Sequence, residues 1–305
     1  MDRARRRATK HAAAEAPGEP AGRGRPSLWG KLLRDRRSLF GLSVLTLMLT
    51  MSLAAPWISP FDPAEQRLLL RLRGPLVEAE PGHRCWLGTD QVGRDNLSRI
   101  IYGGRISLFV GVAAVVLGGT AGVLLGLISG YSGRRLDSLI MRAADVQLSF
   151  PFILLAITVI GAFGPGIFKL VVVLAFSGWV VYARTVRGAV LSVKEDQFVE
   201  AAVALGAMDW RIVLRHLLPN VVSPVIVIAT TQTATMILLE SALSFLGMGV
   251  PAPTPSWGRM LSDGREYLST AWWIATFPGL AIFVAVLGIN LLGDGLNDAI
   301  LSRRR

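Results

Sequence analysis

The sequence contains little charge, one cysteine and three histidines. Only 17% of its 305 residues are charged, and Cys85 is the single cysteine. An internal disulfide and a cysteine-ligated metal centre are therefore excluded. The histidines are scattered outside the apolar runs, and no His-Glu-x-x-His motif occurs. The sequence therefore predicts no metal site and gives no support for a membrane-embedded metalloprotease.

A phosphate-binding loop is also missing. The motif G-x-x-x-x-G-K-[ST] fails at its nearest match, because Leu32 follows Gly30 and Lys31, and Arg25 stands where the first glycine is needed. The chain therefore cannot hydrolyse ATP by itself, and we expect it to bind no cofactor. Clusters of Ser, His and Asp, or pairs of carboxylates, do not occur at membrane depth. We therefore predict that the chain is not an enzyme.

Long apolar runs dominate what is present. Hydrophobic residues make up 52% of the chain, and six runs are long enough to cross the roughly 30 Å of a bilayer's hydrocarbon core. They are residues 39–58, 106–130, 138–163, 167–187, 221–246 and 272–300. The fourth run is the weakest, because it contains Lys169 and must reach Arg184 to be long enough. The sequence therefore predicts an all-α membrane protein with six transmembrane helices.

The distribution of basic residues indicates an orientation. The net charge is +11, and eleven Lys and Arg residues precede the first apolar run, whereas none lies between the third run and Lys169. This is the positive-inside pattern, so the charge reflects membrane orientation and not nucleic-acid binding. The first run has a basic flank like a secretory signal but is too long for one, so we expect a retained anchor. The expected division is a cytoplasmic basic tail (1–38), a first transmembrane helix (39–58), an extracytoplasmic segment (59–105), a core of five transmembrane helices (106–300) and a cytoplasmic tail (301–305).

Residues 195–220 carry several charges between the fourth and fifth apolar runs. A charged residue at the bilayer centre costs roughly 2.5–3.5 kcal/mol on insertion scales, so this segment is expected outside the membrane. Residues 195–205 are rich in alanine and predict a helix that Gly206 breaks. Asp209 then occupies an N-cap position, opening a second short helix that Pro219 ends. Two helices joined by glycine suit docking to a partner protein; an amphipathic helix on the lipid surface is the alternative.

The motif E-A-A-x-x-x-G, followed by H-L-L-P-N, resembles the cytoplasmic coupling motif of ABC importer permeases. Its matching residues are Glu200, Ala201, Ala202 and Gly206. In that family the motif docks into a groove of the ATPase subunit and carries its movement into the membrane. The ATPase-docking residues that the resemblance implies are Glu200, Ala201, Ala202, Gly206, Asp209 and Arg211.

Further stretches resemble the second permease subunit of the dipeptide, oligopeptide and nickel branch of these importers. They are residues 86–108, 145–151, 240–249, 255–261 and 290–298. The resemblance implies the type I ABC importer permease fold in a bacterial cytoplasmic membrane. The implied partners are a second permease subunit, two ATPase subunits that hydrolyse ATP, and an extracytoplasmic substrate-binding protein. One departure is Asn297, where the family usually has Arg.

The substrate that the resemblance implies is a di- or oligopeptide. Nickel or another small solute is an alternative in the same family, but the apolar runs contain no His or Cys to ligate a bare cation. A stand-alone secondary transporter is a further alternative. It has less support, because the chain shows no duplicated half and residues 195–220 would have no purpose.

A ladder of small residues marks the second apolar run. Gly118, Gly122, Gly126 and Gly130 recur every four residues after Ala114. Such spacing lets the backbone of another helix approach closely. Glycine lowers helix propensity, so the ladder indicates packing. The neighbouring helix belongs either to this chain or to the partner permease.

A polar stripe marks the fifth apolar run. Thr230, Thr233, Ile237, Glu240 and Ser244 share one helical face. An ionisable group at membrane depth usually faces a bundle interior or an aqueous cavity. The candidates to line a translocation path are therefore Thr230, Thr233, Glu240 and Ser244. The alternative is a set of interhelical hydrogen bonds, with the threonine hydroxyls bonded to their own backbone.

Two further groups of charges lie near the membrane boundary. We expect Asp145 to form an interfacial ion pair with Arg142, three residues earlier. Residues 88–95 place Asp90 and Arg94 outside the membrane. This stretch is either a structured rim for a binding protein or a turn held by local charge pairs.

Overall fold

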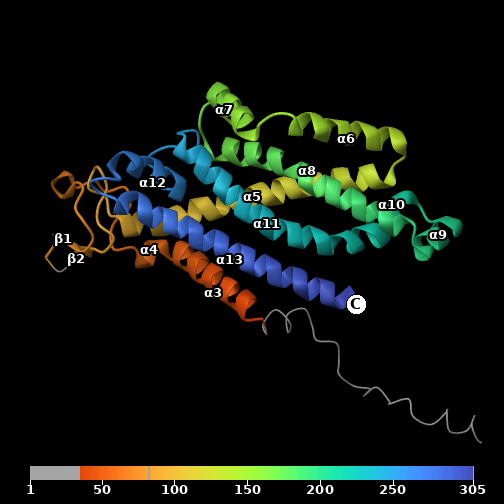
Figure 1. The fold of residues 1–305 in the computed structure, drawn as a ribbon, viewed down its shortest axis with the longest axis horizontal. Helices are drawn as coiled ribbons and strands as arrows, with labels where there is room; N and C mark the ends of the chain where they lie inside the picture. Colours follow the sequence, from red (N-terminus) through yellow and green to blue (C-terminus); the bar gives the residue numbers. More distant parts are fainter. Residues whose placement is uncertain (1–34, 82, 305) are drawn as a thin grey trace, which may run out of the picture.

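The computed structural model describes residues 35–304, apart from residue 82, and these residues are mostly helical (Figure 1). The α-helices are α3 (Arg36–Leu53), α4 (Ala55–Ile58), α5 (Asn96–Tyr131), α6 (Arg134–Leu148), α7 (Phe152–Phe163), α8 (Ile167–Lys194), α9 (Gln197–Ala204), α10 (Asp209–Ile212), α11 (Leu218–Phe245), α12 (Trp257–Gly264) and α13 (Trp273–Arg304). The shorter elements are the 3-10 helices η1 (Leu68–Leu70) and η3 (Arg265–Tyr267), the π-helical turn η2 (Val213–Leu217), and the strands β1 (Val77–Glu80) and β2 (His83–Cys85).

The long helices α5, α8, α11 and α13 run along the longest axis of the molecule (Figure 1). The strands β1 and β2 and the helix α12 lie at one end, which we call the hairpin end. The strands pair antiparallel, with Val77 opposite Cys85. Helices α9 and α10 lie at the other end, which we call the α9 end. The charged segment that the sequence analysis placed outside the membrane therefore lies at one end of the helix bundle.

Four helical stretches in the described part of the chain are long and apolar enough to cross a membrane. They are Asn96–Tyr131, Ile167–Lys194, Asp209–Phe245 and Trp273–Ile300. Helices α6 and α7 would make a fifth if they form one span. Helix α3, over the expected first span, is not among them. An all-helical membrane architecture is therefore present, and the number of six spans stays a prediction.

The third expected span, 138–163, is not one straight helix. Helices α6 and α7 meet at an angle of 85°. Pro151 lies directly before α7, and proline has no N–H to continue the hydrogen bonding of α6. The run of apolar residues passes through this break, so hydrophobicity alone could not reveal the bend.

Helix α5 begins at Asn96, ten residues before the expected start at 106. Its N-cap is Asp95, whose Oδ2 accepts a hydrogen bond from the Ser98 N–H at 2.8 Å. The apolar pattern misses this extension because polar residues interrupt it, although Asn96, Ser98 and Arg99 are buried. The end of the expected extracytoplasmic segment, 59–105, is therefore the first part of α5.

The two expected tails are only partly described. Residues 1–34 of the expected basic tail lie outside the described residues, and α3 begins at Arg36. At the other end, α13 continues to Arg304. Most of the expected tail 301–305 is therefore a continuation of the last helix.

The second helix of segment 195–220 differs from the expectation at both ends. Its N-cap residue is Met208, and Asp209 is the first helical residue. Pro219 does not end the helix, because α10, η2 and α11 form one continuous stretch of 37 residues. The π turn of η2 is wider than an α turn and makes room for the proline ring. The side-chain amide of Asn220 donates to the carbonyl oxygen of His216 at 2.7 Å and satisfies one acceptor there.

Helices α5 and α8 pack along the glycine ladder. A Cβ atom at Gly122 would lie 2.3 Å from the carbonyl oxygen of Trp179, and one at Gly118 would lie 2.5 Å from that of Ala175. The other two glycines of the ladder also face α8. Of the two alternatives for the ladder, the structure therefore describes contact within this chain. The main apolar core lies beside this seam, between α5, α7, α8 and α11.

Candidate functional site

Helix α9 ends at the glycine that the sequence singled out. Gly206 has a φ of +77°, a left-handed conformation that residues with a side chain rarely adopt. Its N–H donates to the Val203 carbonyl at 2.9 Å, and the Ala207 N–H donates to the Ala202 carbonyl at 3.0 Å. These two bonds form a Schellman motif. The helix break that the sequence predicts at Gly206 is therefore present.

The turn after α9 exposes large apolar side chains. Leu205 is 88% exposed, Met208 is 68% exposed and Trp210 is 63% exposed. Three such residues around one turn form an exposed apolar patch, of the kind found at contact sites for other proteins and for membranes. Five of the ATPase-docking residues implied by the resemblance are exposed: Glu200, Ala201, Gly206, Asp209 and Arg211. The sixth, Ala202, is partly buried.

The opposite face of this segment is fixed to the long helices. Val199 of α9, Ile212 of α10 and Leu217 of η2 are buried. They belong to one apolar cluster with Val186 and Val190 of α8. Because interiors are closely packed, a displacement of α9 and α10 acts directly on α8.

Polar contacts add a second connection at the α9 end. The hydroxyl of Tyr131, at the end of α5, donates to Asp209 Oδ1 at 2.6 Å. Lys194 Nζ donates to the carbonyl oxygen of Tyr131 at 3.2 Å. At the start of α6, Asp137 accepts a hydrogen bond from Arg187 Nη2 at 2.6 Å. The first contact joins the segment to α5, and the other two join α8 to α5 and to α6.

A cavity of about 770 Å³ opens between these elements. Its lining residues are Tyr131, Ser132, Gly133, Lys194, Val199, Glu200, Val203, Ala204 and Asp209. The sequence analysis singled out Glu200 and Asp209 but missed Tyr131 and Lys194. No motif marks those two residues, because they approach Asp209 only when α5, α8 and α10 pack together.

The polar stripe on α11 is divided by burial. Glu240 is 0% exposed, its Oε1 accepts from the Ser244 hydroxyl at 2.8 Å, and its Oε2 accepts from Ser107 of α5 at 3.2 Å. Hydroxyl donors of this kind reduce the cost of burying a polar group. Thr230 and Thr233 are partly exposed and donate to carbonyl oxygens of their own helix. All four side chains therefore make the hydrogen bonds of the alternative, and among the four only Thr230 and Thr233 have exposed surface.

Asp145 forms its ion pair with a different arginine from the one expected. Its Oδ1 lies 2.5 Å from Arg184 Nη2 on α8, and both side chains are largely exposed. The expected partner, Arg142, lies on the same helix as Asp145. The prediction of an ion pair was therefore right in kind and wrong in its partner, because the packing of α6 on α8 could not be seen in the sequence.

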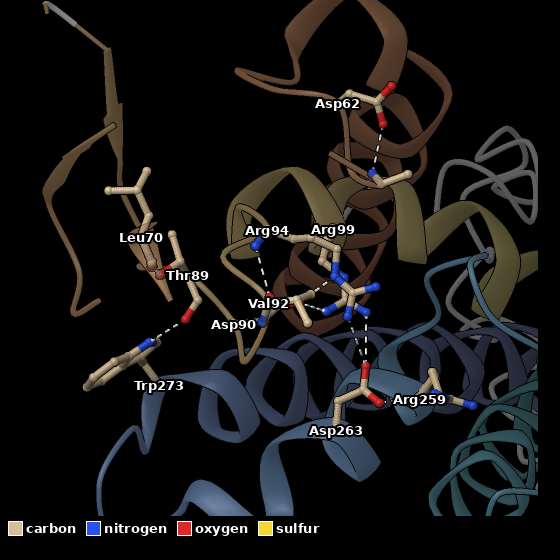
Figure 2. Close-up of polar contacts among 11 residues, drawn as sticks. Asp62, Leu70, Thr89, Asp90, Val92, Arg94, Arg99, Arg259, Asp263 and Trp273 are labelled. Carbon is tan, nitrogen blue, oxygen red and sulfur yellow. Dashed lines mark hydrogen bonds and ion pairs between the residues drawn. The ribbon is translucent and has the colours of Figure 1, made fainter. Parts of the chain in front are cut away.

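Residues 88–95 form a turn that charge pairs fix to α5 and α12 (Figure 2). Arg94 Nε lies 2.6 Å from Asp90 Oδ2, and Arg99 of α5 pairs with the same carboxylate. The other end of the Arg99 guanidinium donates to Asp263 Oδ2 of α12 at 3.1 Å. Of the two alternatives, the structure describes a turn held by charge pairs. These pairs are not only local, because they also reach α12.

Two more residues complete this network, and sequence reasoning missed both. Arg259 Nε donates to Asp263 Oδ1 at 3.0 Å. Trp273 Nε1, at the start of α13, donates to the carbonyl oxygen of Thr89 at 3.1 Å (Figure 2). The turn is thereby attached to α5, which follows it directly, and to α12 and α13, which are distant in sequence.

Two known protein families match this chain. The family described as "Binding-protein-dependent transport system inner membrane component" matches residues 122–305, more than half of the chain. The chain belongs to this family. The "N-terminal TM domain of oligopeptide transport permease C" also matches, over residues 27–75. The permease is thus a membrane-spanning transport component and not an enzyme.

Curated relatives extend the similarity over nearly the whole permease. The di/tripeptide transport system permease protein DppC of Pseudomonas aeruginosa is 41% identical over 272 residues, which cover 89% of this chain and 90% of the relative. The dipeptide transport system permease protein DppC of Bacillus subtilis is 39% identical over 283 residues, covering 90% and 87%. The oligopeptide transport system permease protein OppC of the same species is 38% identical over 278 residues, covering 90% and 89%.

Solved structures agree on the fold. A structure of the MetNI methionine ABC transporter in inward facing conformations has a chain that matches with a TM-score of 0.55 and 20% identity, over 66% of the permease and 96% of that chain. An amino acid ABC transporter solved with histidines matches with a TM-score of 0.52 and 16% identity, over 68% and 95%. The permease therefore has the all-helical fold of ABC transporter permeases.

Proposed function

We propose that this chain is a permease subunit of an ATP-driven importer of di- or oligopeptides. Its proposed partners are a second permease subunit, two ATPase subunits that hydrolyse ATP, and an extracytoplasmic substrate-binding protein. The observation that carries the proposal is the 41% identity to a di/tripeptide permease over 89% of the chain.

In this proposal, α9 and α10 transmit the movement of the ATPase subunits to the membrane helices. The apolar patch of Leu205, Met208 and Trp210 enters a groove of the ATPase, and Glu200 and Arg211 fix its position by charge. When ATP is bound, the ATPase favours one of two packed arrangements of the helices. Release after ATP hydrolysis favours the other arrangement. The buried face of the segment transmits this preference to α8.

Uptake by the complete importer tests the substrate. Vesicles that contain both permeases and both ATPases, supplied with the binding protein and ATP, should accumulate a radiolabelled dipeptide. A complex without this chain is the control. Accumulation of nickel without accumulation of any peptide would contradict the proposed substrate and leave the ATP-driven mechanism standing.

We further propose that the hairpin end is extracytoplasmic and the α9 end cytoplasmic. Cys85 alone cannot report this, because it is 2% exposed and burial raises its pKa to about 12, so the thiol stays protonated and unreactive at neutral pH. Leu69 is 93% exposed and Leu205 is 88% exposed, so single cysteines at these positions are suitable probes. In a Cys85→Ala background expressed without the ATPase subunits, which would cover Leu205, an impermeant maleimide should label Leu69→Cys in spheroplasts and Leu205→Cys only after permeabilisation. The reverse result would contradict the orientation.

We also propose that Thr230 and Thr233 border the translocation path. Single cysteines there should react with small polar thiol reagents, at rates that change when ATP is trapped in the ATPase. Leu238, which is 49% exposed and lies off the face that Thr230 and Thr233 share, provides the control. A cysteine at the control position should stay unreactive in lipid. Equal reactivity at all three positions would show that the stripe is ordinary helix packing.

A further inference from the structure

A small cavity lies within the charge network at the hairpin end. Its volume is about 60 Å³, and it is lined by Arg94, Arg99, Arg259, Asp263, Gln91 and residues 252–254. We propose that this cavity binds a chloride-sized monovalent anion. The proposal concerns the junction between the 88–95 turn and α12 and does not depend on the transported substrate.

The charges in the network do not cancel. The arginines are Arg94, Arg99 and Arg259, and the carboxylates that pair with them are Asp90 and Asp263. Three positive groups and two negative groups leave one positive charge. A buried charge without a counter-ion is unfavourable, so the network favours one added negative charge.

Asp95, the N-cap residue of α5, is the next carboxylate in the sequence, but it does not line the cavity. Its Oδ2 accepts from the N–H and the hydroxyl of Ser98 at 2.8 Å and 2.6 Å. Its buried Oδ1 has no hydrogen-bond partner among the described residues.

Hydrogen-bond donors are also available. The Arg99 side chain is 2% exposed, and its Nε has no hydrogen-bond partner in the described part of the chain, although both Nη atoms are paired with carboxylates. The buried Oε1 of Gln91 likewise has no partner among the described residues. Rotating this amide by half a turn would present its NH₂ group as a donor, because the two orientations are equivalent in shape. An anion in the cavity would accept hydrogen bonds that the protein leaves unmade.

The size of the cavity limits the ligand. One water molecule needs roughly 10–15 Å³ of a volume measured in this way, so the cavity has room for a chloride-sized ion and a few water molecules. Arg259 is 34% exposed and connects the cavity to the surface. A small anion can therefore enter, and gluconate, a much larger anion, serves as the comparison.

Thermal unfolding of the purified full-length permease, with its partner permease, tests the site. Chloride is exchanged for gluconate at constant ionic strength. The unfolding temperature of the wild type should rise with chloride and saturate. Arg259→Gln leaves two arginines against two carboxylates, so its unfolding temperature should no longer depend on chloride. Arg265→Gln is the matched control, because Arg265 is 50% exposed and does not line the cavity, and it should respond like the wild type.

Two results would overturn the proposal. One is an unfolding temperature of the wild type that does not rise and saturate with chloride. The other is an identical chloride response in Arg259→Gln and the wild type. If Arg259→Gln does not fold, crystals of the wild type soaked in bromide decide the question. An anomalous peak between Arg99 and Arg259 supports the site, and its absence at saturating bromide rejects it.

Discussion

Gly206→Val is expected to reduce ATP-driven uptake by about 5–30-fold while the permease stays in the membrane. The φ of Gly206 is +77°, and a left-handed conformation costs a residue with a side chain roughly 1–2 kcal/mol. That cost lowers the ratio of native to open turn by about 5–30-fold, which sets the upper limit of the effect on uptake. When the Schellman motif opens, Leu205 and Met208 leave the positions proposed for docking. Peptide uptake by cells and co-purification of the ATPase subunits measure the effect.

Gly206→Asn is the matched control, because asparagine tolerates the left-handed conformation far better than valine. A Cβ atom at Gly206 would have no other atom within 4 Å, so a steric clash cannot explain a difference between the two variants. Uptake with Gly206→Asn should stay near the wild-type rate. Wild-type uptake with Gly206→Val would refute the role given to this turn.

Gly122→Ala is expected to remove most of the folded permease from the membrane. The added Cβ would lie 2.3 Å from the Trp179 carbonyl oxygen and 2.6 Å from the Tyr182 Cβ. Neither atom can move unless α8 moves, so α5 and α8 must separate. Overpacking of this kind costs about 1–3 kcal/mol, and more where backbone is involved. Immunoblotting of membranes and thermal unfolding in detergent measure the loss.

Gly188→Ala provides the comparison in the partner helix of the same seam. A Cβ atom at Gly188 meets nothing within 4 Å. Alanine favours a helix over glycine by roughly 0.5–1 kcal/mol, so this variant should be as stable as the wild type or slightly more stable. If Gly122→Ala and Gly188→Ala unfold at the same temperature, the close contact between α5 and α8 does not exist in the membrane.

The sequence by itself determined the features that depend on neighbouring residues. Long apolar runs predict α5, α8, α11 and α13, because hydrocarbon accepts only helices that satisfy their own backbone. The glycine at position 206 predicts a helix end, because few other residues adopt its backbone conformation. The coupling motif and the stretches around it predict the family of the chain, and the family match over residues 122–305 confirms that prediction.

Local patterns failed where packing overrides them. Pro219 is expected to stop a helix, but a π turn accommodates it within a continuous stretch. The apolar run 138–163 predicts one helix, but the chain bends by 85° between α6 and α7. In both places the path of the backbone depends on packing against neighbouring helices, and residue type alone does not specify that path.

Only the tertiary structure decided which polar groups meet. Arg99 and Asp263 are 164 residues apart in the chain, yet their side chains lie 3.1 Å apart. Glu240 belongs to an apparent path-lining stripe, but Ser107 of α5 and Ser244 enclose its carboxylate. The physical reason is that helix-forming tendency and hydrophobicity are properties of a short segment, whereas a buried charge is stabilised by whichever partners the packing of distant helices brings to it.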